Sequence, residues 1–220
     1  MQAFGKHPDA PINVGRWDRS PQVFDDCRPY EVRINSQDTY WCQYVYEFSH
    51  ELCHILTNFD EYRRHPYKWF EEALCETATL FVLHGLAEVW ETDPPRDVFR
   101  AREYAPSFRT YAQDIERNHP QPGQDDLPRW LHGHMGDLVA DPYIRESNRT
   151  VAIALLPQFL EDPALWRDCA VLNLWNAGTN TSFSDYLGAW AAHLQPLGRQ
   201  ARVPDLVSRM FLVAPGTLDR

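Results

Sequence analysis

Apolar and polar residues follow two different repeats in this chain, and the first is a period of two. In residues 29–36 (PYEVRINS), every second residue from Tyr30 to Ile34 is apolar and the residues between are charged. This alternation predicts a β-strand with one polar face. Residues 1–29 hold four prolines and little periodicity. They are predicted to be an irregular arm with a short strand near Gln22–Phe24.

The period changes to that of an α-helix at residues 39–57 (TYWCQYVYEFSHELCHILT). The apolar residues there step by three and four positions, and Asp38 precedes them as a plausible N-cap. A polar loop containing Pro66 follows, and a second apolar stripe predicts a helix over about 67–90. Residues 118–130 are predicted to be a loop. Further helices are predicted at about 108–117, 149–161, 163–174, 183–194 and 204–212.

These patterns predict an α+β fold with a short β-sheet, a two-helix module and then an all-α lobe. The sheet is expected to include an edge strand. We assign residues 1–92 to the strand and the two helices, and residues 93–220 to the helical lobe, within one compact unit. The 220 residues, 44% of them hydrophobic, are enough for a buried core without disulfides.

The charge balance narrows the choice of partners. The formal net charge is -10, which argues against nucleic acid and against anionic membranes as partners. No stretch approaches the roughly 20 apolar residues of a membrane span, and the first residues contain no apolar signal core. The cysteines are scattered without a CxxC pair, which predicts reduced thiols in a cytoplasmic protein. They are Cys27, Cys42, Cys53, Cys75 and Cys169.

Residues 50–54 read His-Glu-Leu-Cys-His, an H-E-x-x-H motif inside the first predicted helix. Residues four apart lie on one helical face, so the imidazoles of His50 and His54 can reach one Zn²⁺. Glu51 lies about 100° further round the helix. Its carboxylate would not join the same ligands, but it would reach a water in the open coordination position and act as a general base.

A third protein ligand is needed, and the second predicted helix offers acids. Glu72 and Glu76 are four residues apart and share one face of that helix. One would bind the metal, and the other would accept the free ring N–H of a ligating histidine. Glu71 and Glu72 also suit a solvated helix N-terminus, where acids are favoured without any metal.

The segments HELCH (50–54) and WFEEALCE (69–76) resemble the gluzincins, which are zinc peptidases with H-E-x-x-H and a glutamate on the next helix. The second segment is similar to the W-x-x-E-G-L-A pattern of that family, with Ala73 where glycine is common. The resemblance covers about residues 29–90, with a looser match of the helical second half. It is nearest to the compact members of the family. Seventeen residues separate His54 from Glu72, slightly fewer than in many gluzincins.

The resemblance implies a metallopeptidase that holds one zinc ion per chain and acts on a peptide or protein substrate. The strand at 29–36 would be the edge along which an extended substrate binds. The implied roles are His50, His54 and Glu72 as zinc ligands, Glu51 as general base, and Glu76 as the acid behind a ligating histidine.

Gluzincins often stabilise the oxyanion with a Tyr or His from the second half of the chain. Tyr143 precedes a predicted helix and resembles the family's placement, although a tyrosine with its hydroxyl in solvent would look the same. His132 and His134 are the alternatives. Arg145 and Arg149 would bind a substrate carboxylate or form surface ion pairs, and surface pairing is the more common use.

Other interpretations of the same residues stay open. Asp60 follows His54 at the spacing of a metzincin-like third ligand, with Met135 or Met210 as the associated methionine, but Thr57 stands where that pattern needs a glycine. Cys53 or Cys75 would suit zinc as a thiolate, although core packing is the simpler use.

The expected function is therefore a zinc-dependent hydrolase. A rival hypothesis is a non-catalytic, zinc-stabilised module or scaffold whose fourth coordination position is closed by a Cys or Asp side chain. A third possibility is that no metal binds and the two histidines pack in a core.

Overall fold

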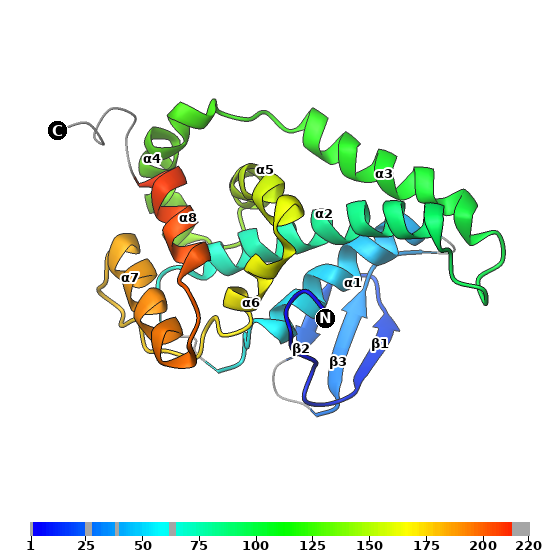
Figure 1. Ribbon diagram of the computed structural model, residues 1–220, viewed down its shortest axis with the longest axis horizontal. Helices are drawn as coiled ribbons and strands as arrows, with labels where there is room; N and C mark the ends of the chain where they lie inside the picture. Colours follow the sequence, from blue (N-terminus) through cyan, green and yellow to red (C-terminus); the bar gives the residue numbers. More distant parts are fainter. Residues whose placement is uncertain (1, 25–27, 38–39, 62–64, 213–220) are drawn as a thin grey trace.

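A computed structural model describes residues 2–24, 28–37, 40–61 and 65–212. It has an α+β fold in which helices dominate and a small sheet lies at one side (Figure 1). Asp38, the expected N-cap, and Cys27 lie outside the described residues. None of the helices in the described part is long and apolar enough to cross a membrane.

The sheet has three strands in the order β1-β3-β2, formed by β1 (Ile12–Arg16), β2 (Gln22–Phe24) and β3 (Tyr30–Ile34). β1 pairs with β3 in parallel and β2 pairs with it antiparallel. The short strand expected near Gln22–Phe24 is confirmed. The rest of residues 1–29 was expected to be irregular, and this is wrong for Ile12–Arg16, which form β1 through pairing with β3. The prediction that residues 29–36 form an edge strand is wrong, because β3 is hydrogen-bonded on both sides. Alternation reveals which face of a strand is buried, but it does not reveal how many neighbours the strand has.

The buried face of the sheet packs on the first helix, α1 (Trp41–Leu56). Val32 and Ile34 of β3 are fully buried against Ile55 of α1. This apolar contact holds the HExxH helix on the sheet and leaves its other face for α2 (Lys68–Thr92). Both helices agree with the predicted ranges to within two residues.

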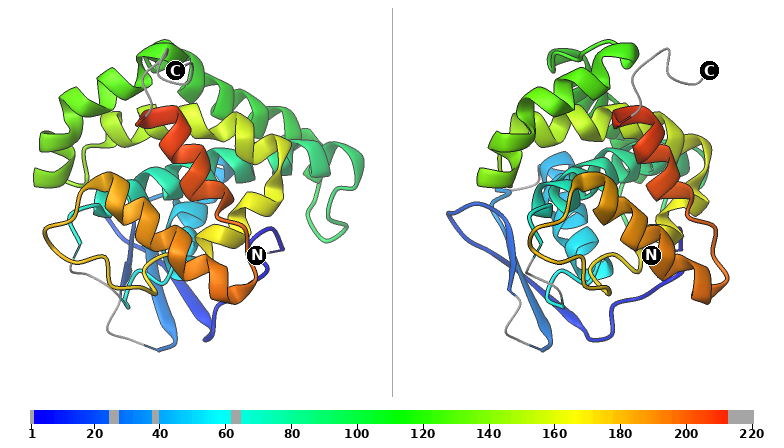
Figure 2. Two further views of the ribbon diagram at one scale, coloured as in Figure 1. Left: turned by 60° about the vertical axis from the view of Figure 1, so that its left-hand side comes forward. Right: turned by 90° about the vertical axis from the view of Figure 1, so that its left-hand side faces the viewer.

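Helix α2 is the central element of the molecule. α1 runs beside it in the opposite direction on the sheet side (Figure 1), and α3 (Ala101–Asn118) and α5 (Arg145–Glu161) pack against it elsewhere. The two views of Figure 2 show the strands and the helices α3 to α5 on opposite sides of the α1–α2 pair. This surrounded position explains why Phe70, Leu74 and Leu80 of α2 are fully buried.

The described residues after 92 form helices joined by turns and loops, and they contain no strand, as the sequence predicts. They are α3 and α5, then α4 (Leu127–Ala140), α6 (Trp166–Cys169), α7 (Phe183–Leu194) and α8 (Arg202–Phe211), with short 3₁₀ turns at Gln124–Asp126, Pro163–Leu165 and Gln195–Leu197.

The helices differ from the prediction in four places. The helix predicted at 163–174 ends at Cys169, and α5 begins at Arg145 instead of near residue 149. The other two differences share one reason. α3 begins at Ala101, not near residue 108, and α4 begins at Leu127 inside the predicted loop. Prolines suggested breaks at both places, but Pro128 lies in the first turn of α4, where its missing N–H has no intrahelical partner to lose. Pro106 lies inside α3 and is tolerated there.

Candidate metal centre

The two histidines of the HExxH motif and the glutamate of the next helix meet at one point between α1 and α2. Glu72 Oε2 lies 3.2 Å from His50 Nε2, and Glu72 Oε1 lies 3.5 Å from His54 Nε2. The two imidazole rings are 5.0 Å apart between centroids. The structure therefore brings together the three side chains that the sequence analysis selected as zinc ligands.

The other nitrogen of each imidazole faces a second carboxylate. His50 Nδ1 lies 3.9 Å from Glu76 Oε2, the residue expected for this role. His54 Nδ1 lies closer to its acid, 3.1 Å from Glu71 Oε1. Carboxylates in these positions fix the ring orientation and tautomer of a ligating histidine.

Glu71 is a residue of the cluster to which the sequence analysis assigned no role. Acids are common in a first helical turn, so a solvated helix N-terminus was the simpler interpretation of it. In the structure Glu71 is buried and also accepts hydrogen bonds from Thr57 Oγ1 (3.0 Å) and Asn173 Nδ2 (2.9 Å). The only sequence signal was its position directly before Glu72 in an otherwise apolar stretch.

Glu76 is held by a buried ion pair from the helical lobe. Arg149 Nε donates to Glu76 Oε1 at 2.8 Å, and the Tyr46 hydroxyl donates to Glu76 Oε2 at 2.6 Å. Arg149 Nη2 also reaches the Tyr46 oxygen at 3.1 Å. Burial, together with the Glu76 charge, raises the pKa of Tyr46 above its ordinary value. Arg149 therefore forms an ion pair, as expected, but the pair is largely buried and does not lie on the surface, and the guanidinium is bound to Glu76.

The charges of the cluster itself are coupled. Burial opposes ionisation of Glu72, but the neighbouring His54 and His50 outweigh it and lower the pKa of the carboxyl well below its ordinary value. Burial also opposes protonation of His54, yet Glu72 and Glu71 raise the pKa of this imidazole well above 6.5. The site thus stabilises a positive charge between its acids. A divalent cation bound by the imidazoles would replace that proton.

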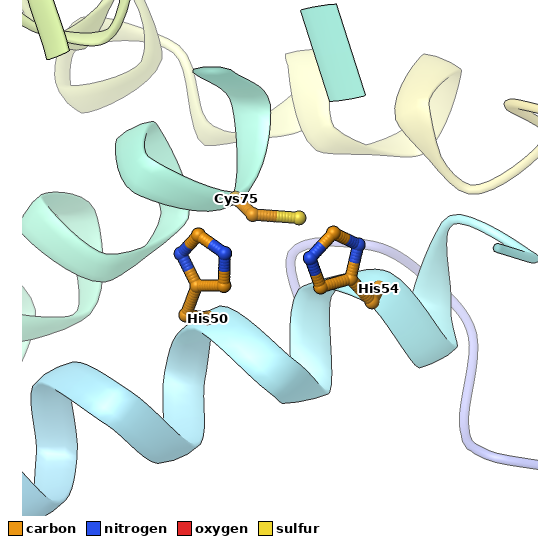
Figure 3. Close-up of side chains that lie close together, drawn as sticks. All are labelled: His50, His54 and Cys75. Carbon is orange, nitrogen blue, oxygen red and sulfur yellow. The ribbon is translucent and has the colours of Figure 1, made fainter. Parts of the chain in front are cut away.

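Cys75 is a further potential ligand. One nitrogen of His50, one nitrogen of His54 and Cys75 Sγ all lie within 4.8 Å of one another, and Figure 3 shows the thiol between the two rings. Tetrahedral zinc with bonds of about 2.0–2.3 Å spaces its ligand atoms by about 3.3–3.8 Å. The separations of 3.2 and 3.5 Å between Glu72 and the two histidines are close to that spacing. Cys75 is fully buried, and this burial raises the pKa of its thiol.

The described cysteines are free and buried, as predicted; they are Cys42, Cys53, Cys75 and Cys169.

Two cavities of about 550 and 450 Å³ meet at the cluster. Glu51 lines both of them although only 4% of its surface is exposed. Its carboxylate makes no hydrogen bond or ion pair with any described residue. A buried acid that faces a cavity without a protein partner is available to a water or a ligand there. The residues common to both cavities are Ser20, Pro21, His50, Glu51, Glu72 and Tyr143.

Tyr143 is the oxyanion candidate that the structure places beside the cluster. It lines both cavities, and 68% of its surface is exposed. Partial removal of this side chain from water, together with the nearby Glu72 charge, raises the pKa of its phenol. His132 and His134 lie on α4 and line neither cavity. The His134 ring stacks on Trp130 at 4.5 Å between centroids, and its Nδ1 lies 2.8 Å from the Trp130 carbonyl.

The metzincin-like set is not assembled. Asp60 forms an ion pair with Arg28 at 2.5 Å, and Thr57 uses its hydroxyl on Glu71. Met135 and Met210 pack against the main apolar core.

The strand beside the site is β2. Its residues Gln22 and Val23 line the smaller cavity together with Pro21, and β2 is the edge strand next to β3. The sequence analysis expected an extended substrate to bind along residues 29–36. In the structure β2, which follows Pro21, has the free edge and the position beside the site that this role requires.

Comparisons with models of protein families, with curated proteins and with solved structures give no match for this chain. The residues of the site therefore carry the functional argument.

Proposed function

We propose that this protein is a zinc-dependent hydrolase, and most specifically a metallopeptidase, with one zinc ion held by His50, His54 and Glu72. The observation that carries the proposal is the geometry between α1 and α2: two Nε2 atoms within 3.2 and 3.5 Å of one carboxylate. Three protein ligands beside an open cavity are typical of catalytic zinc sites. The acids at Nδ1 of each imidazole support the same conclusion.

Zinc bound there would polarise a substrate carbonyl and lower the pKa of a bound water toward about 7. Glu51 is the general base in this proposal. Because its buried carboxylate has no partner among the described residues, it is free to accept a proton from the attacking water. It would then deliver that proton to the leaving amine. Tyr143, at the rim of both cavities, would donate a hydrogen bond to the developing oxyanion.

The edge of β2 supports a peptide as substrate. An extended peptide can add to an exposed sheet edge through main-chain hydrogen bonds, and β2 is an edge strand whose residues line the smaller cavity. A peptide bound along β2 would pass His50, Glu51 and Glu72.

The test separates metal binding from catalysis. Glu51→Gln should retain about one zinc per chain, measured by plasma mass spectrometry. Its rate of cleavage of a mixed peptide library should fall by about 10²- to 10⁴-fold, because the general base is lost. Glu88→Gln removes one acid from an exposed position on α2 and should leave both quantities unchanged. Equal cleavage by the wild-type protein and Glu51→Gln would refute the proposal.

Cys75 favours one second candidate, a non-catalytic zinc-stabilised module. If Cys75 joins His50 and His54, a thiolate closes the site from the core side. Cobalt-loaded protein decides between the two arrangements, because a thiolate ligand adds an intense near-ultraviolet charge-transfer band. We expect no such band in the wild-type protein and an unchanged spectrum in Cys75→Ser. A band that disappears in Cys75→Ser would favour the closed module.

A further inference from the structure

The larger cavity has an unusual charge balance beside the metal cluster. Four acids line it, and two of them are already satisfied by the protein. Glu47 accepts the backbone N–H groups of Asn35 (2.7 Å) and Ser36 (2.9 Å) and the Gln43 side chain (2.7 Å). Glu76 is paired with Arg149.

The other two acids belong to the proposed reaction. Glu72 lies against the two histidines, and Glu51 is the proposed base. Each acid of the cavity therefore has an assigned role or partner that does not involve the cavity's remaining cation.

That cation is Arg145, the first residue of α5. Among the described residues that line this cavity, no other is a lysine or arginine. Arg145 is exposed. Its guanidinium makes no ion pair or hydrogen bond with residues 2–24, 28–37, 40–61 or 65–212. Arg149 lies one turn later on α5, is paired with Glu76 and does not line the cavity. The structure thus distinguishes two arginines that the sequence treats alike.

We propose that Arg145 is a specificity-determining residue that binds a carboxylate of the substrate; this inference rests on the proposed peptidase function. The planar guanidinium binds a carboxylate through two parallel hydrogen bonds, which fixes direction as well as affinity. The protein carries a formal net charge of -10, so an acidic substrate gains nothing from long-range attraction. An unpaired arginine in the cavity supplies the local attraction that such a substrate needs.

The carboxylate can come from two sources, an Asp or Glu side chain or the C-terminus of the peptide. A peptide library digested by the zinc-loaded protein distinguishes them. An acidic side chain appears as enrichment of Asp and Glu at one fixed distance from the cleaved bond. A C-terminal carboxylate appears as cleavage at one fixed distance from the chain end, lost when the same peptides are amidated.

Arg145→Gln should abolish either preference. For a synthetic peptide that carries the selected carboxylate, KM should rise between about three- and tenfold, because the pair is charge-assisted but partly open to solvent. The matching peptide with an amide in place of that carboxylate should be cleaved equally by both proteins. Arg102→Gln removes the same charge from an exposed position of α3 outside the cavity, and it should retain the preference.

Binding measured without turnover keeps this inference separate from the proposed function. Zinc-loaded Glu51→Gln should bind the labelled acidic peptide more tightly than its amide counterpart in fluorescence anisotropy, and Glu51→Gln with Arg145→Gln should not. If no peptide is cleaved but this difference is found, the peptidase proposal fails and the role of Arg145 stands. Cleavage or binding without any preference for a carboxylate, or a preference retained in Arg145→Gln, would overturn the role of Arg145.

Discussion

Two ionic clusters lie one helical turn apart between α1 and α2, and they differ in what supplies the positive charge. In the first, Tyr46 and Glu76 are joined by Arg149, a permanent cation from α5. In the second, His50, His54 and Glu72 converge beside a cavity, and their only cation within the described chain is a protonated imidazole. The same pair of helices has thus produced one cluster that is balanced by a permanent cation and one that is balanced by a dissociable proton.

The difference teaches how adjacent acids on one helix acquire different roles. Glu72 and Glu76 are one turn apart on α2, and by sequence each could have bound the metal. Arg149 removes that choice, because it neutralises Glu76 and leaves Glu72 facing the imidazoles. Structural stability is therefore expected from the first cluster and metal chemistry from the second.

The largest effect should come from Glu72→Gln. A neutral amide is a much poorer ligand for Zn²⁺ than a negatively charged carboxylate, so zinc affinity should fall by more than about 100-fold. Competition with a chromophoric chelator would measure this. Glu88→Gln should bind zinc like the wild-type protein. Near-normal zinc binding by Glu72→Gln would show that another group, such as Cys75, completes the site.

Arg149→Met should act on the first cluster and lower the free energy of unfolding by about 3–5 kcal/mol, because it leaves the buried Glu76 carboxylate unpaired. Urea denaturation of the metal-free protein measures this change. Adding Glu76→Gln should recover part of the loss, since the stranded charge is then removed. If Arg149→Met is as stable as the wild-type protein, the contrast between the two clusters is lost.

Glu71→Gln tests the acid behind His54. The amide keeps the shape of the side chain but orients the imidazole less strongly, so zinc affinity should fall by about 10- to 100-fold. Chelator competition again gives the affinity, and the unfolding transition of the metal-free variant serves as the control for folding. An unchanged zinc affinity would mean that Glu71 has only a structural role.

The smallest effect should be the pH dependence, and its direction should reverse when zinc is removed. Without metal, His54 has a raised pKa, so its stabilising contribution is complete below the ordinary value of 6.5 and is lost as the pH rises through the raised pKa. Glu72 has a lowered pKa, so its contribution is present above 4.5 and is lost as the pH falls through the lowered pKa. In the metal-free protein, the contribution of this cluster to the free energy of unfolding should therefore be smaller at about pH 9 than at about pH 6.

With zinc, protons compete with the metal for His54, so zinc affinity should weaken as the pH falls, by up to about tenfold per pH unit for one proton. The weakening should begin above pH 6.5 because the pKa of His54 is raised. Thermal melting of both forms across this range measures the two trends. Parallel trends in the two forms would contradict the exchange of a proton for a metal ion.

The sequence alone determined the parts of this protein that depend on local periodicity. The apolar stripes predict α1 and α2 to within two residues. Spacing along each helix selects the pair His50 and His54 and the pair Glu72 and Glu76, and the resemblance to gluzincins assigns the ligand position to Glu72. Such patterns are readable because a helix places residues three and four apart on one face in any context.

Only the tertiary structure decided the strand order and the side-chain partners that come from distant parts of the chain. The pairing of β1 with β3 turns the expected edge strand into the central one. Packing of α5 against α2 pairs Arg149 with Glu76, which is 73 residues away in the sequence. The same packing leaves Arg145 in the cavity. Glu71 acquires its role through Asn173 and His54 in the same way. These assignments follow from how whole elements pack, and a local pattern of residues carries no information about the side chain that a distant helix will bring to it.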